Sequence, residues 1–579
     1  MKSPFSSASL TIHPAYLTFY FTGLLLPEFW LQPTQPWWRM PLGVAFNAVI
    51  YAVLAWGVVT LLSWMKRYTG RILPLVLHTL LHGVVLLWCI TQGFLMYHFR
   101  RHIDAFTLQL VRESSPRESS EFLHTYLLTP SGACAAAVLL LLGLCYLKGV
   151  RKVKEIPAWP TRLQGRVAMG IALAAVGAQA YFFWGTAEEC YAKAQGTPIK
   201  CNAFFTLRQS VLQMKEYEQD IRTCAAQLAQ LPPDQPCTGT EPDVVLIIGE
   251  SFIKKHSSLY GYSLPTNPRL QTRLKEGGLF LFNDVIAPIN NTTYSLQYFL
   301  SLAKVEDSAR WCERPLLPAI MKQNGWNVVY YSNQFCREDD LQPWDASMGF
   351  LNYPPIEEKL FHHRNRHTFP YDRQLVEDYA LHRRELEQPT NNLILFHLIG
   401  QHVNAKSRFP ESETHFTSDA IRRPDLTDKQ KQLVADYDNA TRYNDQVVDR
   451  IIQLFETRKA IVIYFSDHGE EMYDFRKQHG RTDLKVDLTP EAYRYQLEIP
   501  FMVYLTPACR QDTALCQKVR SGLHRPFMTD GLPYFIFDLV APNSRWADAT
   551  QSPVSPSYVV PKRRRIFYAD RYYEEMIGR

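Results

Sequence analysis

Hydrophobic residues follow two different patterns along this chain. In the first third they form long runs, at Tyr16–Leu31, Leu42–Trp64, Ile72–Tyr97, Tyr126–Leu147 and Val167–Trp184. Runs of about 20 apolar residues have the length that a helix needs to cross a hydrocarbon core of roughly 30 Å. No small-residue cleavage motif follows the first run, which indicates a retained anchor. We therefore predict an N-terminal α-helical transmembrane domain of about five spans over residues 1–185.

From residue 242 the apolar runs become short and alternate with amphipathic stretches. The runs typical of buried strands are Val244–Ile248, Leu279–Phe282, Trp326–Tyr331, Leu393–Leu398, Ala460–Phe465 and Phe501–Leu505. Helical spacing of apolar residues intervenes at Tyr294–Ala303, Leu316–Gln323, Tyr371–Leu386 and Asp428–Glu456. Short strands alternating with helices are typical of a sheet covered by helices. We predict a linker over 186–241 that begins helical and ends extended, and an α/β domain over 242–579.

Charge divides the chain at nearly the same place. Residues 1–186 contain 15 Lys and Arg against 6 Asp and Glu, and the remainder contains 47 against 50. A nucleic-acid-binding protein needs a basic surface on its soluble part, so this balance argues against nucleic acid as a partner. Basic residues cluster at Lys66–Arg71 and Lys148–Arg166, between predicted spans. By the positive-inside rule these loops are cytoplasmic, and everything after Gly185 lies outside.

Cysteine positions fit an oxidising outer compartment. Eight of the 11 cysteines lie beyond the predicted spans, in the close couples Cys190/Cys201, Cys224/Cys237, Cys312/Cys336 and Cys509/Cys516. Thiols in such a compartment are usually paired, so we expect disulfides within these couples. Eight cysteines allow many connectivities, and free buried thiols are the alternative.

Polar residues of chemical interest follow three of the predicted strands. Glu250 follows the first, His402 comes shortly after the Leu393 strand, and Asp467 and His468 follow the Ala460 strand. Chemistry in open α/β sheets gathers beyond the carboxyl ends of the strands. Glu250, Asp467 and His468 form an oxygen and nitrogen set that suits zinc with one open position. Taken alone, the Asp-His pair is more typical of a capped turn and Glu250 of a helix cap, and only their joint occurrence favours a metal site.

The fourth ligand of such a site is expected to be the nucleophile, because a metal lowers the pKa of a bound oxygen. A threonine at the start of the predicted helix after Asn290 would meet an incoming phosphate with backbone N–H groups behind it. An ordinary N-cap is the alternative, and the local pattern alone favours it.

The ordered segments resemble those of one enzyme family. IIGES at Glu250, SLYGYSLPTNPRL, NNTTYSL at Thr292, HLIGQH and YFSDHGEEMYD occur in the order found in the membrane-bound phosphoethanolamine transferases of the alkaline-phosphatase/sulfatase superfamily. YDNATRYNDQVV and the RFP after LIGQH make the chain most similar to the branch that modifies the lipopolysaccharide core. The SDHGEE-type motif alone is shared with sulfatases and phosphoglycerol transferases.

The resemblance implies a function and a set of site residues. It implies a zinc ion (Zn²⁺) held by Glu250, Thr292, Asp467 and His468, with Thr292 attacking phosphatidylethanolamine to form a phosphoethanolamine-threonine intermediate. A lipopolysaccharide acceptor, in lipid A or the core, would then take the group. His402 and His479 would bind phosphate or transfer protons, although the spacing of His479 from His468 departs from the commoner family form. Thr293 remains an alternative nucleophile; Thr292 is preferred because the family's nucleophile stands three residues before a serine, here Ser295.

The same resemblance implies a multi-pass protein of the Gram-negative inner membrane, with its catalytic domain in the periplasm and acting as a monomer. The alternatives are a related phosphoglycerol transferase, a phosphatase or sulfatase-type hydrolase, and transfer to a different envelope glycan. A non-enzymatic envelope protein is a further alternative. Sulfatases use a modified residue within a C/S-x-P-x-R pattern, which this sequence lacks.

Overall fold

The computed structural model describes residues 203–579, except 335, 337–348, 476–477, 483, 485–487 and 568–570, together with helix α3 (Ile72–Phe99) and scattered short stretches within 47–193. The chain forms two compact units, Met1–Tyr217 and Glu218–Arg579. The division falls within helix α9 (Ala203–Ala229), and the residues between α9 and the first strand form no helix or strand.

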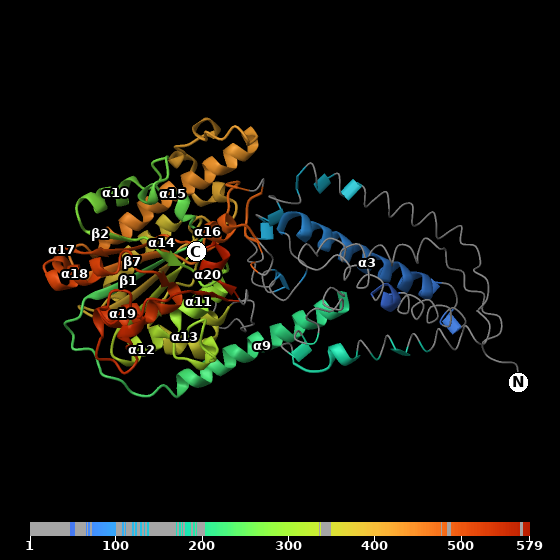
Figure 1. Cartoon of the computed structure of the whole chain (residues 1–579), viewed down its shortest axis with the longest axis horizontal. Helices are drawn as coiled ribbons and strands as arrows, with labels where there is room; N and C mark the ends of the chain where they lie inside the picture. The colour runs from blue at the N-terminus through green and yellow to red at the C-terminus, as the bar shows by residue number, and fades with distance from the viewer. Residues whose placement is uncertain are drawn as a thin grey trace, which may run out of the picture. The chain divides into compact units, whose positions relative to one another are not determined.

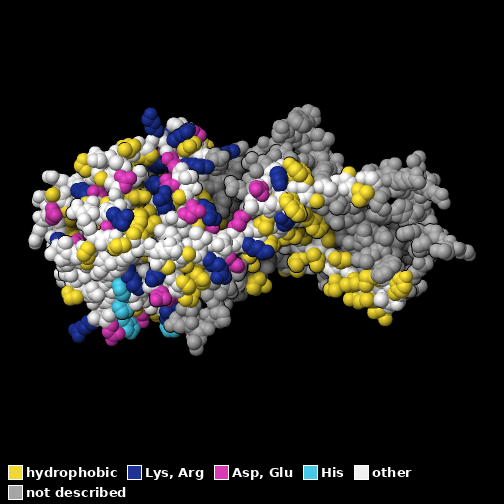
Figure 2. Space-filling view, turned by 90° about the horizontal axis from the view of Figure 1, so that it is seen from below, with side chains coloured by type: hydrophobic (Ala, Val, Ile, Leu, Met, Phe, Trp, Pro, Cys, Tyr) yellow, Lys and Arg dark blue, Asp and Glu magenta, His cyan; other side chains and the backbone are white. Residues whose placement is uncertain are grey.

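In the first unit, α3 coincides with the predicted span at Ile72–Tyr97. Its side chains Leu80, Val84 and Leu87 are exposed. On the face of the molecule drawn in Figure 2, hydrophobic side chains of the described residues gather at the surface. Within the residues that the structure describes, no helix is both long enough and apolar enough to cross a membrane. The other four predicted spans lie wholly or partly outside the described residues, so the number of spans stays a prediction.

The second unit is built on a sheet that has seven strands among the described residues, in the order β2–β8–β7–β1–β6–β4–β5. Their bounds are β1 Asp243–Gly249, β2 Leu279–Phe282, β4 Asn327–Ser332, β5 His363–Arg364, β6 Asn392–His397, β7 Ala460–Ser466 and β8 Phe501–Leu505. Strands β7, β1, β6, β4 and β5 run parallel, and β8 is antiparallel to β7 and β2. The carboxyl ends of the parallel strands therefore meet at one edge of the sheet.

Helices cover both faces of this sheet. Side chains of a strand alternate between the faces, and Val245 and Ile247 of β1 share a core with Tyr379 of α14 (Asp372–Leu386) and Tyr437 of α15 (Asp428–Phe455). On the opposite face, Phe299 of α11 (Thr292–Leu300) packs edge-on against Phe465 of β7. Helices α12 (Leu317–Gln323) and α19 (Leu532–Val540) lie on the same side as α11 (Figure 1).

The remaining elements of the unit are short. The helices are α10 Pro268–Lys275, α13 Pro354–Leu360, α16 Pro490–Leu497, α17 Pro507–Arg510, α18 Thr513–Ser521 and α20 Tyr573–Met576. Two further pairings, β3 (Val285–Ile286) with β9 (Phe527–Met528) and β10 (Arg565–Ile566) with β11 (Arg571–Tyr572), lie outside the main sheet.

The six predicted strands are confirmed, each with both ends within one residue of the observed bounds. The four predicted helices are confirmed as well, but the helix predicted at Tyr294–Ala303 is observed at Thr292–Leu300, so it begins two residues and ends three residues earlier than expected. Strand β5 was not predicted, because two residues carry no recognisable alternation of apolar and polar side chains.

Helix α15 joins two of the segments that carry the family resemblance. Its Asp445 carboxylate accepts hydrogen bonds from the backbone N–H groups of Arg269 (2.8 Å) and Leu270 (3.0 Å), in the first turn of α10. An acidic group is stabilising there because it satisfies N–H groups that have no partner within the helix. The YDNATRYNDQVV segment thus holds the SLPTNPRL segment in place.

The predicted disulfides are not confirmed. All described members of the four couples carry free thiols, and Cys201 lies outside the described residues. Burial raises the pKa of the Cys224 thiol, and the neighbouring Cys312 thiol raises it further. Cys224 therefore lies near Cys312, whereas the predicted couples pair Cys224 with Cys237 and Cys312 with Cys336.

Candidate metal centre and nucleophile

Two adjacent strands deliver the acidic groups of the candidate site. Strands β1 and β7 pair in parallel, with Gly249 opposite Ser466. Glu250 and Asp467, the next residues of each strand, therefore leave the sheet side by side. The backbone N–H of Asp467 donates to the carbonyl oxygen of Gly249 at 3.0 Å, which continues the pairing to the point where the chains diverge.

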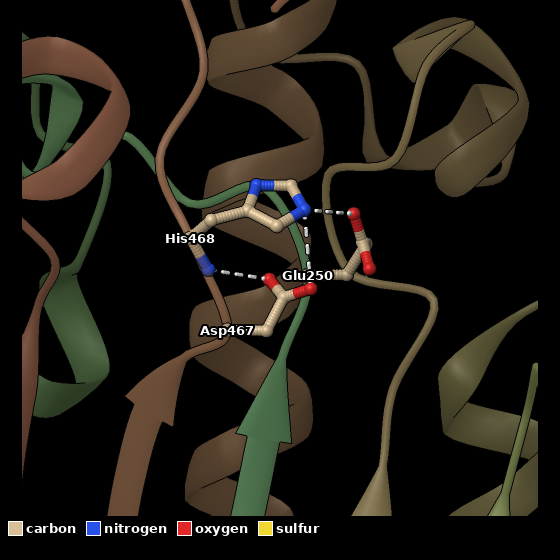
Figure 3. Close-up of side chains that lie close together, drawn as sticks. All are labelled: Glu250, Asp467 and His468. Carbon is tan, nitrogen blue, oxygen red and sulfur yellow. Dashed lines mark hydrogen bonds and ion pairs between the residues drawn. The ribbon is translucent and has the colours of Figure 1, made fainter. Parts of the chain in front are cut away.

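Glu250, Asp467 and His468 converge into one buried cluster (Figure 3). One potential ligand atom from each lies within 4.8 Å of the others. Nε2 of His468 is 3.4 Å from Glu250 Oε1 and 3.2 Å from Asp467 Oδ2. The Nδ1 of His468 lies 2.8 Å from the carbonyl oxygen of Gly469. Because a carbonyl only accepts, Nδ1 carries the proton and the Nε2 lone pair faces the two carboxylates.

The protonation of these groups reflects burial and their neighbours. Burial, followed by the charge of Arg481, lowers the pKa of His468 to about 3, so the imidazole is neutral at physiological pH. Burial and the Glu250 carboxylate raise the pKa of Asp467 well above its usual range. Burial also opposes ionisation of Glu250, but its neighbours His468, His402 and Arg481 favour the carboxylate form and hold the pKa of Glu250 low.

The donor set fits a divalent cation. Asp467 Oδ2 is buried and has no hydrogen-bond partner in the part of the chain that the structure describes. An unpaired buried carboxylate oxygen is costly unless a cation or a donor satisfies it. Two carboxylates and one neutral imidazole, with their ligand atoms turned to a common centre, are the oxygen and nitrogen donors that catalytic zinc sites use.

The hydroxyl of Thr292 reaches this cluster. Its Oγ1 donates to Glu250 Oε2 at 2.9 Å and lies 3.3 Å from His468 Nε2. The N-cap of α11 is Asn291, whose side-chain oxygen accepts from the backbone N–H of Tyr294 at 3.0 Å. The N-cap alternative is therefore wrong for Thr292, because capping falls to Asn291 and Thr292 is the first residue of the helix.

Of the other described side chains that contact the cluster, two were missed by the sequence interpretation. Arg481 donates from Nη1 to His468 Nε2 at 2.8 Å and to the carbonyl of Asn290 at 3.3 Å. Gln334 donates from Nε2 to Glu250 Oε2 at 3.3 Å. Their positions in the sequence could have indicated both residues, because Arg481 stands two residues after His479 and Gln334 follows the carboxyl end of β4.

The two predicted substrate-binding histidines lie in loops near these elements. His402 is half-buried in the loop after β6, and the Asp372 carboxylate fixes that loop by accepting from the N–H groups of Ile399 (3.0 Å) and Gly400 (2.9 Å). His402 acts electrostatically on Glu250, which places it close to the cluster. The ring of His479 packs against Tyr473 with centroids 5.3 Å apart. The roles of both histidines stay predictions.

The backbone around the cluster is unusually constrained. Ser251, directly after Glu250, has a φ of 55°, in the left-handed region that side chains other than glycine seldom adopt. Gly400 has a φ of 47°, and a Cβ added there would lie 2.9 Å from the backbone nitrogen of Glu250. A glycine is thus required where the His402 loop passes Glu250.

We compared the chain with known protein families and with curated proteins. Residues 242–528 match the sulfatase family. The chain is similar to phosphoethanolamine transferase EptC of Escherichia coli, with 28% identity over 341 residues, or 55% of each chain. It is 32% identical over 281 residues to phosphoethanolamine transferase EptA of Helicobacter pylori, covering 47% of this chain and 50% of that one. The chain thus spans about half the length of the curated relatives it matches.

A solved structure matches over most of the chain. It is the integral membrane protein lipooligosaccharide phosphoethanolamine transferase A (EptA) from Neisseria meningitidis, with a TM-score of 0.61, 18% identity, and coverage of 95% of this chain and 98% of that one. At that identity the match shows a shared fold. The segment that matches the sulfatase family, residues 242–528, contains Glu250, Thr292, Asp467 and His468.

Proposed function

We propose that this protein transfers phosphoethanolamine from phosphatidylethanolamine to lipopolysaccharide, in lipid A or the core. The observation that carries the proposal is the position of Thr292, whose hydroxyl lies 2.9 Å from Glu250 Oε2 and 3.3 Å from His468 Nε2 at the start of α11. The names of the E. coli and H. pylori relatives support the choice of phosphoethanolamine as the transferred group.

Glu250, Asp467 and His468 would hold one zinc ion, with Thr292 Oγ1 as the fourth donor. When bound, zinc would lower the pKa of the threonine hydroxyl and offset charge on the phosphoryl group. The unsatisfied Asp467 Oδ2 and the inward lone pair of His468 support this assignment.

Transfer would take place in two displacements. In the first, Thr292 Oγ1 forms a bond to phosphorus while its proton passes to the Glu250 carboxylate, and the bond from phosphorus to the diacylglycerol oxygen breaks. The diacylglycerol oxygen takes a proton from His402 or His479. In the second, an acceptor oxygen attacks the same phosphorus and gives its proton to the histidine that protonated the diacylglycerol oxygen, while Thr292 leaves and takes back the proton held by Glu250. Because the group waits on the enzyme, two lipid substrates need not occupy the site together.

Arg481 and the N-terminus of α11 would stabilise the phosphoryl charge. Phosphoryl transfer depends mainly on positioning and charge stabilisation, and a guanidinium keeps its charge and presents a planar set of donors. The Nη1 of Arg481 is 2.8 Å from His468 Nε2, which itself lies next to the Thr292 hydroxyl. The N-terminus of a helix also favours a bound anion.

The proposed setting is the inner membrane of a Gram-negative bacterium, with a monomeric protein and a periplasmic catalytic domain. The exposed apolar side chains of α3 and the apolar runs of the first third support a membrane location. Such a location would bring the site to its lipid substrates.

Intact-mass spectrometry of the full chain, purified in detergent and incubated with phosphatidylethanolamine, tests the proposal. We expect a mass increase of one phosphoethanolamine group on the wild-type chain and on Thr293→Ala, and none on Thr292→Ala. An adduct that persists on Thr292→Ala would contradict the assignment of the nucleophile. Release of free phosphoethanolamine with no transfer to added lipopolysaccharide would instead indicate a hydrolase.

A further inference from the structure

A second buried cluster of one histidine and two carboxylates lies in the same domain. Nδ1 of His256 is 2.6 Å from Asp438 Oδ1, and Nε2 is 3.0 Å from Asp474 Oδ1. Tyr262 donates from its hydroxyl to Asp438 Oδ2 at 2.8 Å. The side chains of His256 and Asp438 are 2% and 0% exposed, and that of Asp474 is 10% exposed. Both ring nitrogens therefore have a carboxylate partner in a water-poor environment.

The imidazole of this cluster carries a positive charge. Burial opposes that charge, but Asp474 and Asp438 outweigh it and raise the pKa of His256 to about 10. Among the residues that the structure describes, the groups in contact with the ring are these two carboxylates and the rings of Tyr262 and Tyr437, neither of which is cationic. The cluster is thus a doubly paired buried cation.

On one side the cluster adjoins the end of β1. The ring of Tyr437 stands edge-on to His256, with centroids 5.2 Å apart. Its hydroxyl donates to the carbonyl of Ser251 at 2.6 Å and accepts from the N–H of Ile253 at 2.8 Å. His256 therefore packs against the residue that fixes the strained backbone following Glu250.

On the other side the cluster holds the segment that ends at Arg481. Asp474 uses Oδ1 for His256 and accepts at Oδ2 from the backbone N–H of Met472 at 3.0 Å. The N–H of Gly480 donates to the carbonyl of Glu471 at 2.9 Å. Because Asp474 holds Met472, and Glu471 next to it holds Gly480, hydrogen bonds connect Asp474 to the residue that precedes Arg481.

We propose that His256 is a positioning residue that clamps Asp474, and with it the segment 471–481, so that Arg481 is held beside His468 to receive the substrate phosphate. This inference rests on the proposed function for the phosphate-binding role of Arg481. The partners of His256 stand 182 and 218 residues away along the chain, so the clamp exists only in the folded domain.

The test compares Asp474→Asn and His256→Gln with the wild-type full chain, using His382→Gln as the control because His382 is an exposed histidine on α14. We expect both clamp variants to raise KM for phosphatidylethanolamine roughly tenfold while the rate at saturating donor and the zinc content remain near wild type. Hydrogen exchange should accelerate in segment 471–481 and stay unchanged in β1. Asp474→Asn removes one counter-charge, so its KM should rise between about pH 6 and about pH 9 while that of the wild type does not.

A merely structural role would lower thermal stability in all conditions without a selective change in KM or a new pH dependence. Wild-type KM and wild-type exchange of segment 471–481 in a folded Asp474→Asn chain would overturn the inference, and so would loss of zinc from that variant. If the wild type itself forms no phosphoethanolamine adduct, the proposed function fails separately. The exchange comparison then still decides whether His256 clamps the segment.

Discussion

The two buried histidine clusters of the α/β domain each contain one imidazole and two carboxylates, but the imidazole is neutral in one cluster and positively charged in the other. In the first, His468 faces Glu250 and Asp467, and its pKa is lowered to about 3. In the second, His256 faces Asp438 and Asp474, and its pKa is raised to about 10. Both imidazoles are fully buried, so desolvation alone cannot account for the difference.

The difference comes from the partner of the second ring nitrogen and from nearby cations. Nδ1 of His468 donates to the carbonyl of Gly469, and Arg481 donates to its Nε2, so the ring is held neutral with a lone pair directed inward. Both nitrogens of His256 meet carboxylates, so the ring keeps its second proton. A neutral ring with an inward lone pair suits a metal ligand, whereas a doubly paired imidazolium suits a structural clamp.

The largest expected effect separates the clusters by activity. Asp467→Asn should slow formation of the threonine adduct at least about a thousandfold, because it removes a carboxylate that we propose as a zinc ligand beside the Thr292 hydroxyl. Asp438→Asn, the matched change in the clamp, should slow it far less. Rapid-quench mass spectrometry provides the rates, and equal losses in the two variants would erase the functional distinction between the clusters.

The next effect separates them by stability. His256→Gln leaves two buried carboxylates without their cation, and breaking a buried ion pair costs about 3–5 kcal/mol of unfolding free energy. Urea denaturation of the full chain in detergent measures that loss. His382→Gln, at an exposed pair, should change the unfolding free energy by less than about 1 kcal/mol. A loss of that small size for His256→Gln would show that the ion pairs do not stabilise the fold.

A third effect is the pH dependence of the clamp. The pKa of His256 is about 10 in the folded domain and near 6.5 in an unfolded chain, so the folded state binds the extra proton between these values. The stabilisation is fully present below the unfolded value and is lost as pH rises through the folded value. The difference in unfolding free energy between wild type and His256→Gln should therefore shrink as pH rises from about 7 through about 10. A difference that stays constant would indicate a neutral histidine.

The smallest effect concerns the helix that carries Thr292. Asn291→Ala removes the N-cap of α11 and should cost about 0.5–2 kcal/mol of unfolding free energy. Asn291→Asp keeps an acceptor and should cost less. If Asn291→Ala forms the adduct at the wild-type rate, the cap serves stability only; a large loss of rate would show that the cap also positions Thr292.

Sequence reasoning located the strands and one edge of the site for a physical reason. Strands buried on both faces appear as continuous apolar runs, and Glu250 and Asp467 are the residues directly after two such runs. Parallel pairing of β1 with β7 then brings them together without any contribution from loop conformation. As possible N-caps, Asn291, Thr292 and Thr293 looked equivalent in the sequence, because only the observed start of α11 distinguishes a cap from the first helical residue.

The missed residues depend on loops and on distant partners. Arg481 reaches His468 only because the preceding segment folds back through Gly480 and Glu471. Asp438 offered a signal that was not used, since a carboxylate on the buried face of α15 requires a buried partner. The identity of that partner, His256, could not be read from spacing along the chain.

Zinc content of the purified full chain tests the central claim most directly, because it asks which of two chemically alike clusters binds a metal. We predict one zinc ion per chain in the wild type and in His256→Gln, and less than about a tenth of that in Glu250→Gln and in Asp467→Asn. Full zinc occupancy in both Glu250→Gln and Asp467→Asn, or equal zinc loss from His256→Gln, would contradict the assignment of the metal centre.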